Sequence, residues 1–459
     1  MLEKLLLPEV KELLEANDLS TLDDVLNTWL AADLGGLVQA LAPDEQVQIL
    51  RILRPPLTAT TFAYLESDTQ ERLLEALGPD EAARILNDMA PDDRTALLEE
   101  LPAALRERLL GLLSPGERAV AQSLLEYAED SVGRLMTPDF VAVRPDWTMR
   151  RVLDHVREYG TDSETLNVIY IVDDQNRLID DLRIREVLLA PLGAHARDLI
   201  DNRFVCLNVD ADKKTAVDLF RKYDRTALPV IDHDGRLVGI VTIDDVLDVA
   251  EEAATREIQR FGGVEALDDP YMSTPLPAMV RKRASWLVVL FLGEMLTATA
   301  MGYFQVEIAK AVVLALFVPL IISSGGNSGS QAATLIIRAL ALGEVRLGQW
   351  WLVMRRELIS GLALGTILGS IGFLRIALWS SVSNLYGPHW VLVGLTVALS
   401  LVGIVLWGTL SGSMLPFLLK SLGFDPATSS APFVATLVDV TGLIIYFTVA
   451  LIVLKGTLL

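Results

Sequence analysis

Five long apolar stretches dominate the second part of this 459-residue chain. Each of them is long enough to cross a hydrocarbon layer of about 30 Å as a helix. Five such runs in succession are improbable in the core of a soluble protein, so we predict a membrane domain with five spans. The predicted spans are Ala284–Phe304, about Ala311–Leu340, Leu358–Val382, Trp390–Leu419 and Pro432–Leu454.

Formal charge divides the chain into two unlike parts near residue 270. The whole sequence carries −21, but residues 271–459 contain six Asp and Glu against eleven Lys and Arg, whereas the first 270 residues contain 54 acids against 28 bases. Phosphate binding requires a basic face, so the acidic part argues against a nucleic-acid partner. Such a part suits cations, although solubility alone would also explain its charge.

Several other classes of function lack their residues. Cys206 is the only cysteine, and the four histidines show no ligand spacing, so neither a disulfide nor a thiolate metal cluster is expected. The sequence contains no P-loop and no nucleophile–base pair that can be placed, so we do not expect an enzyme. The N-terminus lacks a signal-peptide pattern.

Lysine and arginine are concentrated before the first predicted span and between the second and third. The positive-inside rule then predicts a multi-pass protein surrounded by membrane lipid. We expect it in the plasma (inner) membrane, with the N-terminus in the cytoplasm and the C-terminus outside.

Asp439 is the most unusual residue of the predicted spans, in "PFVATLVDVTG". An acid near the middle of a membrane helix costs about 2.5–3.5 kcal/mol on insertion scales. A carboxylate there suits Mg²⁺, which is often bound through one or two carboxylates with its waters retained. The stretch "SSGGNSGSQ" interrupts the second span, and we expect a broken helix whose freed carbonyls, with Asn327 and Gln331, offer neutral oxygen ligands.

Glu294 and Arg375 are two further charged residues inside the predicted spans. They could form an internal ion pair that only stabilises the helix bundle, or Arg375 could extend outward to the membrane surface. The role of Glu294 stays open.

Residues 1–130 contain short amphipathic segments with a recurring start signal. The signal reads "LAPDE", "LGPDE", "MAPDD" and "LSPGE", in which Pro near the first helical position is followed by an acid. Repeated short helices of this kind predict a small α-solenoid.

Residues 131–250 contain an internal repeat of strand, turn and strand, preceded in each copy by a helix. The second copy, "ALPVIDHDGRLVGIVTIDDVLDVA", resembles a CBS domain, and the two copies together resemble a tandem CBS pair. The first copy departs from the pattern with "LIDDLRIREV". CBS pairs often bind adenine nucleotides, so the resemblance implies an adenine nucleotide at this pair.

Together with "GGNSGSQAATLIIRAL" and "GSMLPFLLKSLGFDPA", these motifs make the whole chain resemble the MgtE family of Mg²⁺ channels and transporters. The resemblance implies a multidomain protein and a homodimer whose pore lies on the dimer axis. Its parts are an acidic, all-α superhelical N-terminal domain (1–130), α/β tandem CBS domains (131–250), a connecting plug helix (251–270) and a transmembrane pore domain with five spans (271–459).

The resemblance also assigns roles to individual residues. In the pore, Asp439 contacts the ion through water, the Ala435 carbonyl assists, and Asn327 lies close to the same path. The soluble domains bind cytosolic Mg²⁺, which closes the pore through the plug helix. Motif matching places the sensor acids at Asp92, Asp224, Asp245, Asp248 and Glu257.

Three positions depart from the acids that the family commonly has, namely Ala96, Lys214 and Arg256. We therefore expect fewer sensor sites or weaker gating than in typical members. Arg256 could instead pair with Glu252, four residues earlier.

The sequence thus predicts a homodimeric, Mg²⁺-selective channel or transporter for magnesium uptake that cytosolic Mg²⁺ closes. One alternative is a CBS-regulated transporter of another divalent cation such as Co²⁺. An anion transporter would need cationic rings, for which the spans offer only Arg375. Another alternative is a membrane Mg²⁺ sensor that transports nothing.

Overall fold

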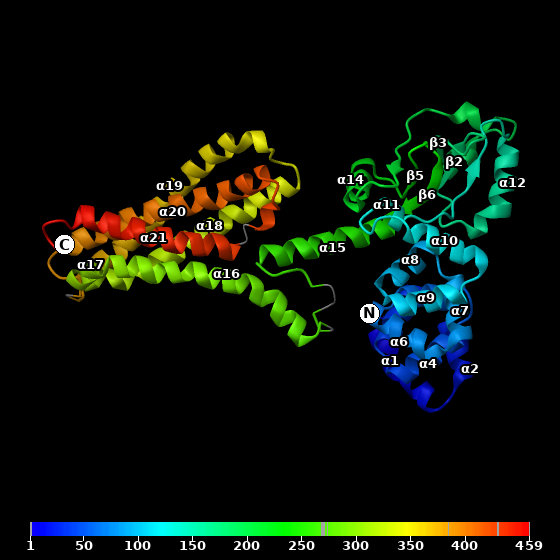
Figure 1. Cartoon of the computed structure of the whole chain (residues 1–459), viewed down its shortest axis with the longest axis horizontal. Helices are drawn as coiled ribbons and strands as arrows, with labels where there is room; N and C mark the ends of the chain where they lie inside the picture. Colours follow the sequence, from blue (N-terminus) through cyan, green and yellow to red (C-terminus); the bar gives the residue numbers. More distant parts are fainter. Residues whose placement is uncertain (1, 268–270, 273, 384, 429–430, 459) are drawn as a thin grey trace. The chain divides into compact units, whose positions relative to one another are not determined.

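The structure is a computed structural model, and it describes residues 2–267, 271–272, 274–383, 385–428 and 431–458 (Figure 1). The chain forms two compact units, Met1–Glu251 and Glu252–Leu459. The first unit contains the acidic part of the sequence, and the second contains the apolar stretches.

Short helices make up the beginning of the first unit, as the sequence predicts. The Pro of each start signal occupies the first turn of a helix, where its missing N–H removes no hydrogen bond. Acids follow Pro in the first turn and favour the positive end of the helix dipole. One apolar core, which includes Phe62, joins the helices. They are α1 (Leu2–Glu15), α2 (Leu19–Leu26), α3 (Ala31–Gln39), α4 (Pro43–Ile52), α5 (Leu57–Ala63), α6 (Ser67–Leu77), α7 (Pro79–Asp88), α8 (Pro91–Glu100), α9 (Ala103–Leu112) and α10 (Pro115–Leu125).

The predicted internal repeat forms two small sheets with the same topology. In each, a short first strand pairs in parallel with the second strand, which pairs antiparallel with the third. A helix connects the two parallel strands, as parallel pairing requires. The elements are α11 (Val132–Leu135), β1 (Ala142–Val143), α12 (Met149–Tyr159), β2 (Val168–Val172), β3 (Leu178–Arg183), α13 (Ile184–Leu189), β4 (Leu207–Asn208), α14 (Lys213–Tyr223), β5 (Ala227–Ile231) and β6 (Leu237–Thr242), with short 3-10 turns at Gly160–Asp162 and Ala196–Leu199.

The departure in the first repeat does not prevent strand formation. The residues "LIDDLR" form β3, and Asp180 within it is almost fully buried. Its carboxylate accepts hydrogen bonds from the backbone N–H groups of Asp201 and Asn202, at 2.8 and 2.9 Å. The buried charge is therefore satisfied by the chain itself.

Helix α15 (Ile243–Phe261) begins directly after β6 and runs across the boundary between the two units. The expected plug helix, 251–270, overlaps it only as far as Phe261. Two glycines follow, and Gly263 adopts a left-handed φ of +73° that ends the helix. The last three residues of the expected range, 268–270, lie outside the described part of the chain.

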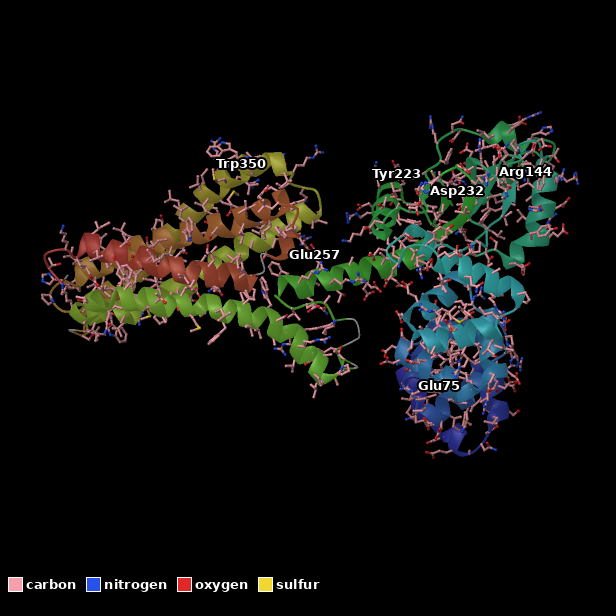
Figure 2. The ribbon with its side chains drawn as sticks, viewed as in Figure 1. Glu75, Arg144, Tyr223, Asp232, Glu257 and Trp350 are labelled. Carbon is pink, nitrogen blue, oxygen red and sulfur yellow. The ribbon has the colours of Figure 1, made fainter. Side chains whose placement is uncertain are left out.

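Within the described residues, five helices of the second unit are long and apolar enough to cross a membrane, in agreement with the predicted spans. Trp350 begins the third of them (Figure 2). The long helices are α16 (Leu276–Tyr303), α18 (Val318–Ala341), α19 (Trp350–Ser380), α20 (Trp390–Ser421) and α21 (Ala431–Val453); α17 (Gln305–Lys310) and the 3-10 turns Val312–Phe317, Leu347–Gln349 and Pro426–Thr428 lie between them.

The expected break in the second span is wrong in its position. Helix α18 continues through "SSGGNSGSQ", and the interruption lies before it, at the 3-10 turn Val312–Phe317. A Cβ on Gly408 would lie 2.5 Å from the Gly325 carbonyl oxygen, and one on Gly412 would lie 2.1 Å from the Gly329 carbonyl oxygen. The glycines thus allow α18 and α20 to pack backbone against backbone, and they supply no freed carbonyl ligands.

Candidate ion pathway and acidic cavity

Asp439 lies on α21 at the point where this helix packs against α18. A Cβ placed on Gly326 of α18 would lie 3.5 Å from Asp439 Oδ1 and 3.5 Å from the Ala435 Cβ. Ala435 stands one turn before Asp439, as the 3.6-residue period requires. The structure therefore brings Asp439 and Ala435 together on the face of α21 that meets α18.

Asn327, the third predicted pore residue, directly follows Gly326 on α18 and is exposed in the single chain. Its Nδ2 donates to Ser323 Oγ at 3.3 Å, one turn earlier. An exposed amide inside a membrane helix calls for a polar partner or water. Asn327 thus adjoins Gly326, the α18 residue that meets Asp439, and its own side chain is exposed in the single chain.

Arg375 does not form the ion pair that the sequence allowed. Its Nη1 donates to the Tyr386 hydroxyl at 3.4 Å, and its guanidinium lies 5.7 Å from the centre of the Trp379 ring. Within the described residues, no carboxylate lies within ion-pair distance of Arg375. Hydrogen bonding and a cation–π contact satisfy this charge instead.

A second feature with unusual charge is a cavity of about 630 Å³ in the first unit. Helices of the N-terminal part, loops of the first repeat and the start of α15 line it together. Its lining contains no Lys or Arg among the described residues, and nine of the lining residues are acids. We call it the acidic cavity; the acids are Asp88, Asp93, Glu117, Asp139, Asp162, Glu164, Asp244, Asp245 and Asp248.

Electrostatic crowding changes how these acids ionise. Burial first, and then the neighbouring acids, raise the pKa of Asp245 to about 7, although a hydrogen bond from Thr242 opposes the shift. Burial and the charge of Asp245 raise the pKa of Asp92, which adjoins the cavity, well above its ordinary value. Burial and neighbouring acids likewise raise the pKa of Asp93 and of Glu164. At neutral pH the site holds more negative charge than it can stabilise alone.

Among the described residues, no group of three His, Cys, Asp or Glu side chains is already arranged as a metal's first coordination shell. Mg²⁺ does not need such a shell, because it dehydrates reluctantly and keeps several waters. Carboxylates spaced around a cavity of this volume fit a divalent ion that keeps its hydration shell. Thr242, whose hydroxyl donates to Asp245 Oδ2 at 2.7 Å, fixes the direction of one of them.

Arg94 stands behind the acidic cavity and was not among the predicted site residues. Its side chain is fully buried, its Nη1 donates to the Leu86 carbonyl at 3.0 Å, and its Nη2 pairs with Glu117. It also lowers the pKa of Asp139, although burial and Glu117 raise that pKa overall. Arg94 thus fixes α8 against α7 and α10 and holds one cavity acid in place.

The predicted sensor acids fall into two groups. Asp92, Asp245 and Asp248 gather at the acidic cavity. Asp224 is exposed at the left-handed C-terminal end of α14, with φ of +50°, and does not line it. Glu257 is exposed on α15 in the second unit (Figure 2).

The structure adds acids that motif matching missed. Asp93 and Asp244 directly adjoin predicted residues in "APDD" and "DDVLD", so their positions were readable from the same motifs. Glu164 and Asp139 belong to loops with no recognisable pattern, and only the fold brings them to the cavity. Of the departing positions, Ala96 and Lys214 do not line it.

The end of α15 is attached within the second unit. Arg260 Nη1 donates to Asp425 Oδ2 at 2.8 Å, and Phe261 packs against the core of the long helices. A pocket of about 270 Å³ beside this ion pair is lined by Glu265 and Trp286 among others. The predicted intrahelical pair is confirmed, since Arg256 Nη2 lies 2.7 Å from Glu252 Oε2.

A buried polar cluster lies where the two repeats meet. Tyr170 is fully buried in a shared apolar core with Ile240, and its hydroxyl has no hydrogen-bond partner among the described residues. Burial raises the pKa of Tyr170, and the nearby Arg225–Asp181 ion pair, at 3.1 Å, acts on it electrostatically. An orphaned buried hydroxyl beside a cation offers contacts to a polar ligand.

Profiles of known families match three parts of the chain. Residues 318–449 match the MgtE profile described as "Divalent cation transporter", residues 30–130 match the "MgtE intracellular N domain", and residues 132–193 and 196–252 each match the CBS domain.

Relatives match over most of their length. The magnesium transporter MgtE of Thermus thermophilus is 41% identical over 339 residues, which are 74% of this chain and 73% of that protein. The magnesium transporter MgtE of Bacillus subtilis is 28% identical over 72% of this chain and 71% of that protein.

A solved structure of the cytosolic domain of the Mg²⁺ channel MgtE in complex with ATP is also similar. Its sequence is 35% identical, the match covers 53% of this chain and 99% of the solved chain, and the TM-score is 0.51. The soluble part of a magnesium transporter is 26% identical, with coverage of 55% and 99% and a TM-score of 0.52. On these grounds the chain, a multi-pass membrane protein with an N-terminal helical domain and tandem CBS domains, belongs to the MgtE family.

Proposed function

We propose that this protein is a Mg²⁺-selective channel or transporter for magnesium uptake. The observation that carries the proposal is Asp439, a carboxylate held against α18 among the long apolar helices, in a chain whose relatives are magnesium transporters. An acid at such a position marks an ion path rather than a structural contact. The Ala435 carbonyl and the Asn327 amide supply neutral oxygen ligands to the hydrated ion.

We propose a homodimer with the pore on its axis. Asn327 is exposed in the single chain, and a pore on a dimer axis provides a wet, polar surface for it. Two copies of Asp439 around one axis give a local charge that matches one divalent ion.

Cytosolic Mg²⁺ closes the pore through the acidic cavity. Clustered carboxylates with raised pKa values repel one another, and a divalent ion converts this repulsion into attraction between the N-terminal helices and the repeats. The ion shifts the equilibrium between the open and the closed state only to the extent that it binds the closed state more tightly than the open one. Asp92, Asp245 and Asp248 are its proposed ligands, with Asp224 and Glu257 acting outside the cavity.

An adenine nucleotide at the CBS pair modulates this response. Tyr170 offers a buried hydroxyl, and Arg225 offers a cation suited to phosphate. The similar solved structure with ATP supports the assignment. In the proposed orientation, the N-terminal unit lies on the cytoplasmic side of the plasma (inner) membrane, and the C-terminus lies outside.

The test is the Asp439→Asn variant in a transporter-null strain starved of Mg²⁺. We expect loss of Mg²⁺ uptake with normal expression and dimer formation. Glu344→Gln removes one charge from an exposed loop and is the matched control. Normal uptake by Asp439→Asn would overturn the proposal. No uptake by the wild-type protein would favour a sensor, and stronger uptake of Co²⁺ than of Mg²⁺ would favour another cargo.

A further inference from the structure

Glu294 is a second carboxylate within the long apolar helices, and the proposed ion path through Asp439, Ala435 and Asn327 does not include it. It lies on α16, nine residues before the helix ends at Tyr303, or about 14 Å from that end at 1.5 Å per residue. A glutamate side chain is far too short to reach water over that distance. An acid fixed at such a depth is costly in lipid, so it marks a functional contact.

The backbone of α16 places Glu294 beside α21. A Cβ on the preceding residue, Gly293, would lie 3.1 Å from Thr436 Cγ2, so the two helices approach closely at this level. Thr436 stands three residues before Asp439, which puts both on neighbouring positions of one helix face. The Glu294 carboxylate is close enough to act electrostatically on Asp439.

Neither acid is neutralised by the protein. Within the described residues, no Lys, Arg or His lies within ion-pair distance of Glu294 or Asp439. Arg375, the cation in the third predicted span, is engaged by Tyr386 and Trp379. Two acids thus lie on neighbouring helices, α16 and α21, with no cation of the described residues beside them, and like charges on them repel each other.

We propose that Glu294 is a second carboxylate of the ion pathway, and that it binds the hydrated divalent cation together with Asp439 of the same chain. This inference rests on the proposed function. A divalent ion with retained waters is large enough to contact both carboxylates through its hydration shell. Each protomer then contributes two acids, so Glu294 tunes affinity for the ion while Asp439 remains the acid against α18.

The test compares Mg²⁺ flux into proteoliposomes for the wild-type protein, Glu294→Gln, Glu294→Asp and Met295→Gln. Met295→Gln places the same amide at the next, exposed position of α16 and controls for a polar substitution there. For Glu294→Gln we expect the half-saturating Mg²⁺ concentration to rise about fivefold, the Coulomb effect of one charge on a divalent ion at roughly 8 Å in a watery path. Glu294→Asp should restore most of the wild-type value.

A structural role would give a different pattern. Loss of maximal flux or of dimer yield at an unchanged half-saturating concentration would overturn the inference, and so would failure of Glu294→Asp to restore affinity. If Glu294→Gln fails to assemble, Glu294→Asn is compared with Glu294→Asp, because these two shorter side chains differ only in charge. A higher half-saturating concentration is expected for Glu294→Asn, and equal values reject the inference. Absence of flux in the wild-type protein would reject the proposed function itself.

Discussion

Asp245→Asn should stabilise the soluble unit in the absence of Mg²⁺. Burial and neighbouring acids raise the pKa of Asp245 from 3.8 to about 7, so its charged form is disfavoured in the folded state. A shift of that size corresponds to at most roughly 4 kcal/mol. Because Asp245 is partly exposed and coupled to its neighbours, we expect about 1–2 kcal/mol. The asparagine oxygen can still accept the Thr242 hydrogen bond.

The gain should depend on pH in a definite direction. Well below pH 3.8, the carboxyl is protonated in both states, so the variant has no advantage from charge. Between about pH 4 and pH 7 the unfolded carboxyl ionises while the folded one keeps its proton, and wild-type stability falls. Above about pH 7 the full difference between variant and wild type is present.

Thermal unfolding of a fragment that ends at Phe261 measures this difference. In chelator at pH 7.5, 1–2 kcal/mol corresponds to a rise in Tm of about 3–6 °C for a fragment of this size. With millimolar Mg²⁺ the wild-type fragment should regain most of that difference, since the ion relieves the repulsion. Glu158→Gln removes an exposed charge from α12 and should change neither value. A lower Tm for Asp245→Asn in chelator, or a gain in Tm that is as large at pH 4 as at pH 7.5, would refute the reasoning.

Two further outcomes follow from contacts in the second unit. Gly412→Ala should prevent recovery of monodisperse protein in size-exclusion chromatography, because its Cβ would meet the Gly329 carbonyl oxygen at 2.1 Å; Gly403→Ala on the same helix meets only a side-chain atom at 3.3 Å and should be tolerated. Equal recovery of the two would show that α18 and α20 can separate. Arg260→Gln should raise the Mg²⁺ concentration for proteolytic protection of α15 about two- to fivefold, since an exposed ion pair contributes up to about 1 kcal/mol. Asp425→Asn should raise this Mg²⁺ concentration by the same factor, and the double variant should raise it no further than either single variant. Additive effects of the two substitutions would show that the pair does not couple α15 to the spans.

The elements set by local chemistry could be predicted from the sequence. Pro followed by acids located the starts of α4, α7, α8 and α10. The length of the apolar stretches predicted the majority of the span ends to within a few residues. A membrane helix needs little more than length and hydrophobicity. The strand–turn–strand pattern located both sheets.

Other features depend on contacts between distant segments. Glycine reads as a helix breaker in "GGNSGSQ", yet here it serves the close approach of α18 to α20, which only the partner helix reveals. Glu164 has no motif around it, and it reaches the acidic cavity because the repeats fold against the N-terminal helices. Arg94 looks like a surface residue in "PDDR", but it is completely buried, and its partners lie on α7 and α10. Tertiary packing decides such positions.

Control of the pore by the acidic cavity is tested most directly by Mg²⁺ flux in proteoliposomes at increasing Mg²⁺ on the side of the soluble unit. We predict that the wild-type protein closes steeply at millimolar concentrations. The variant with Asn at Asp92, Asp245 and Asp248 should stay open while keeping its Mg²⁺ selectivity. Closure of that variant at the wild-type concentration would contradict a gate that works through the acidic cavity.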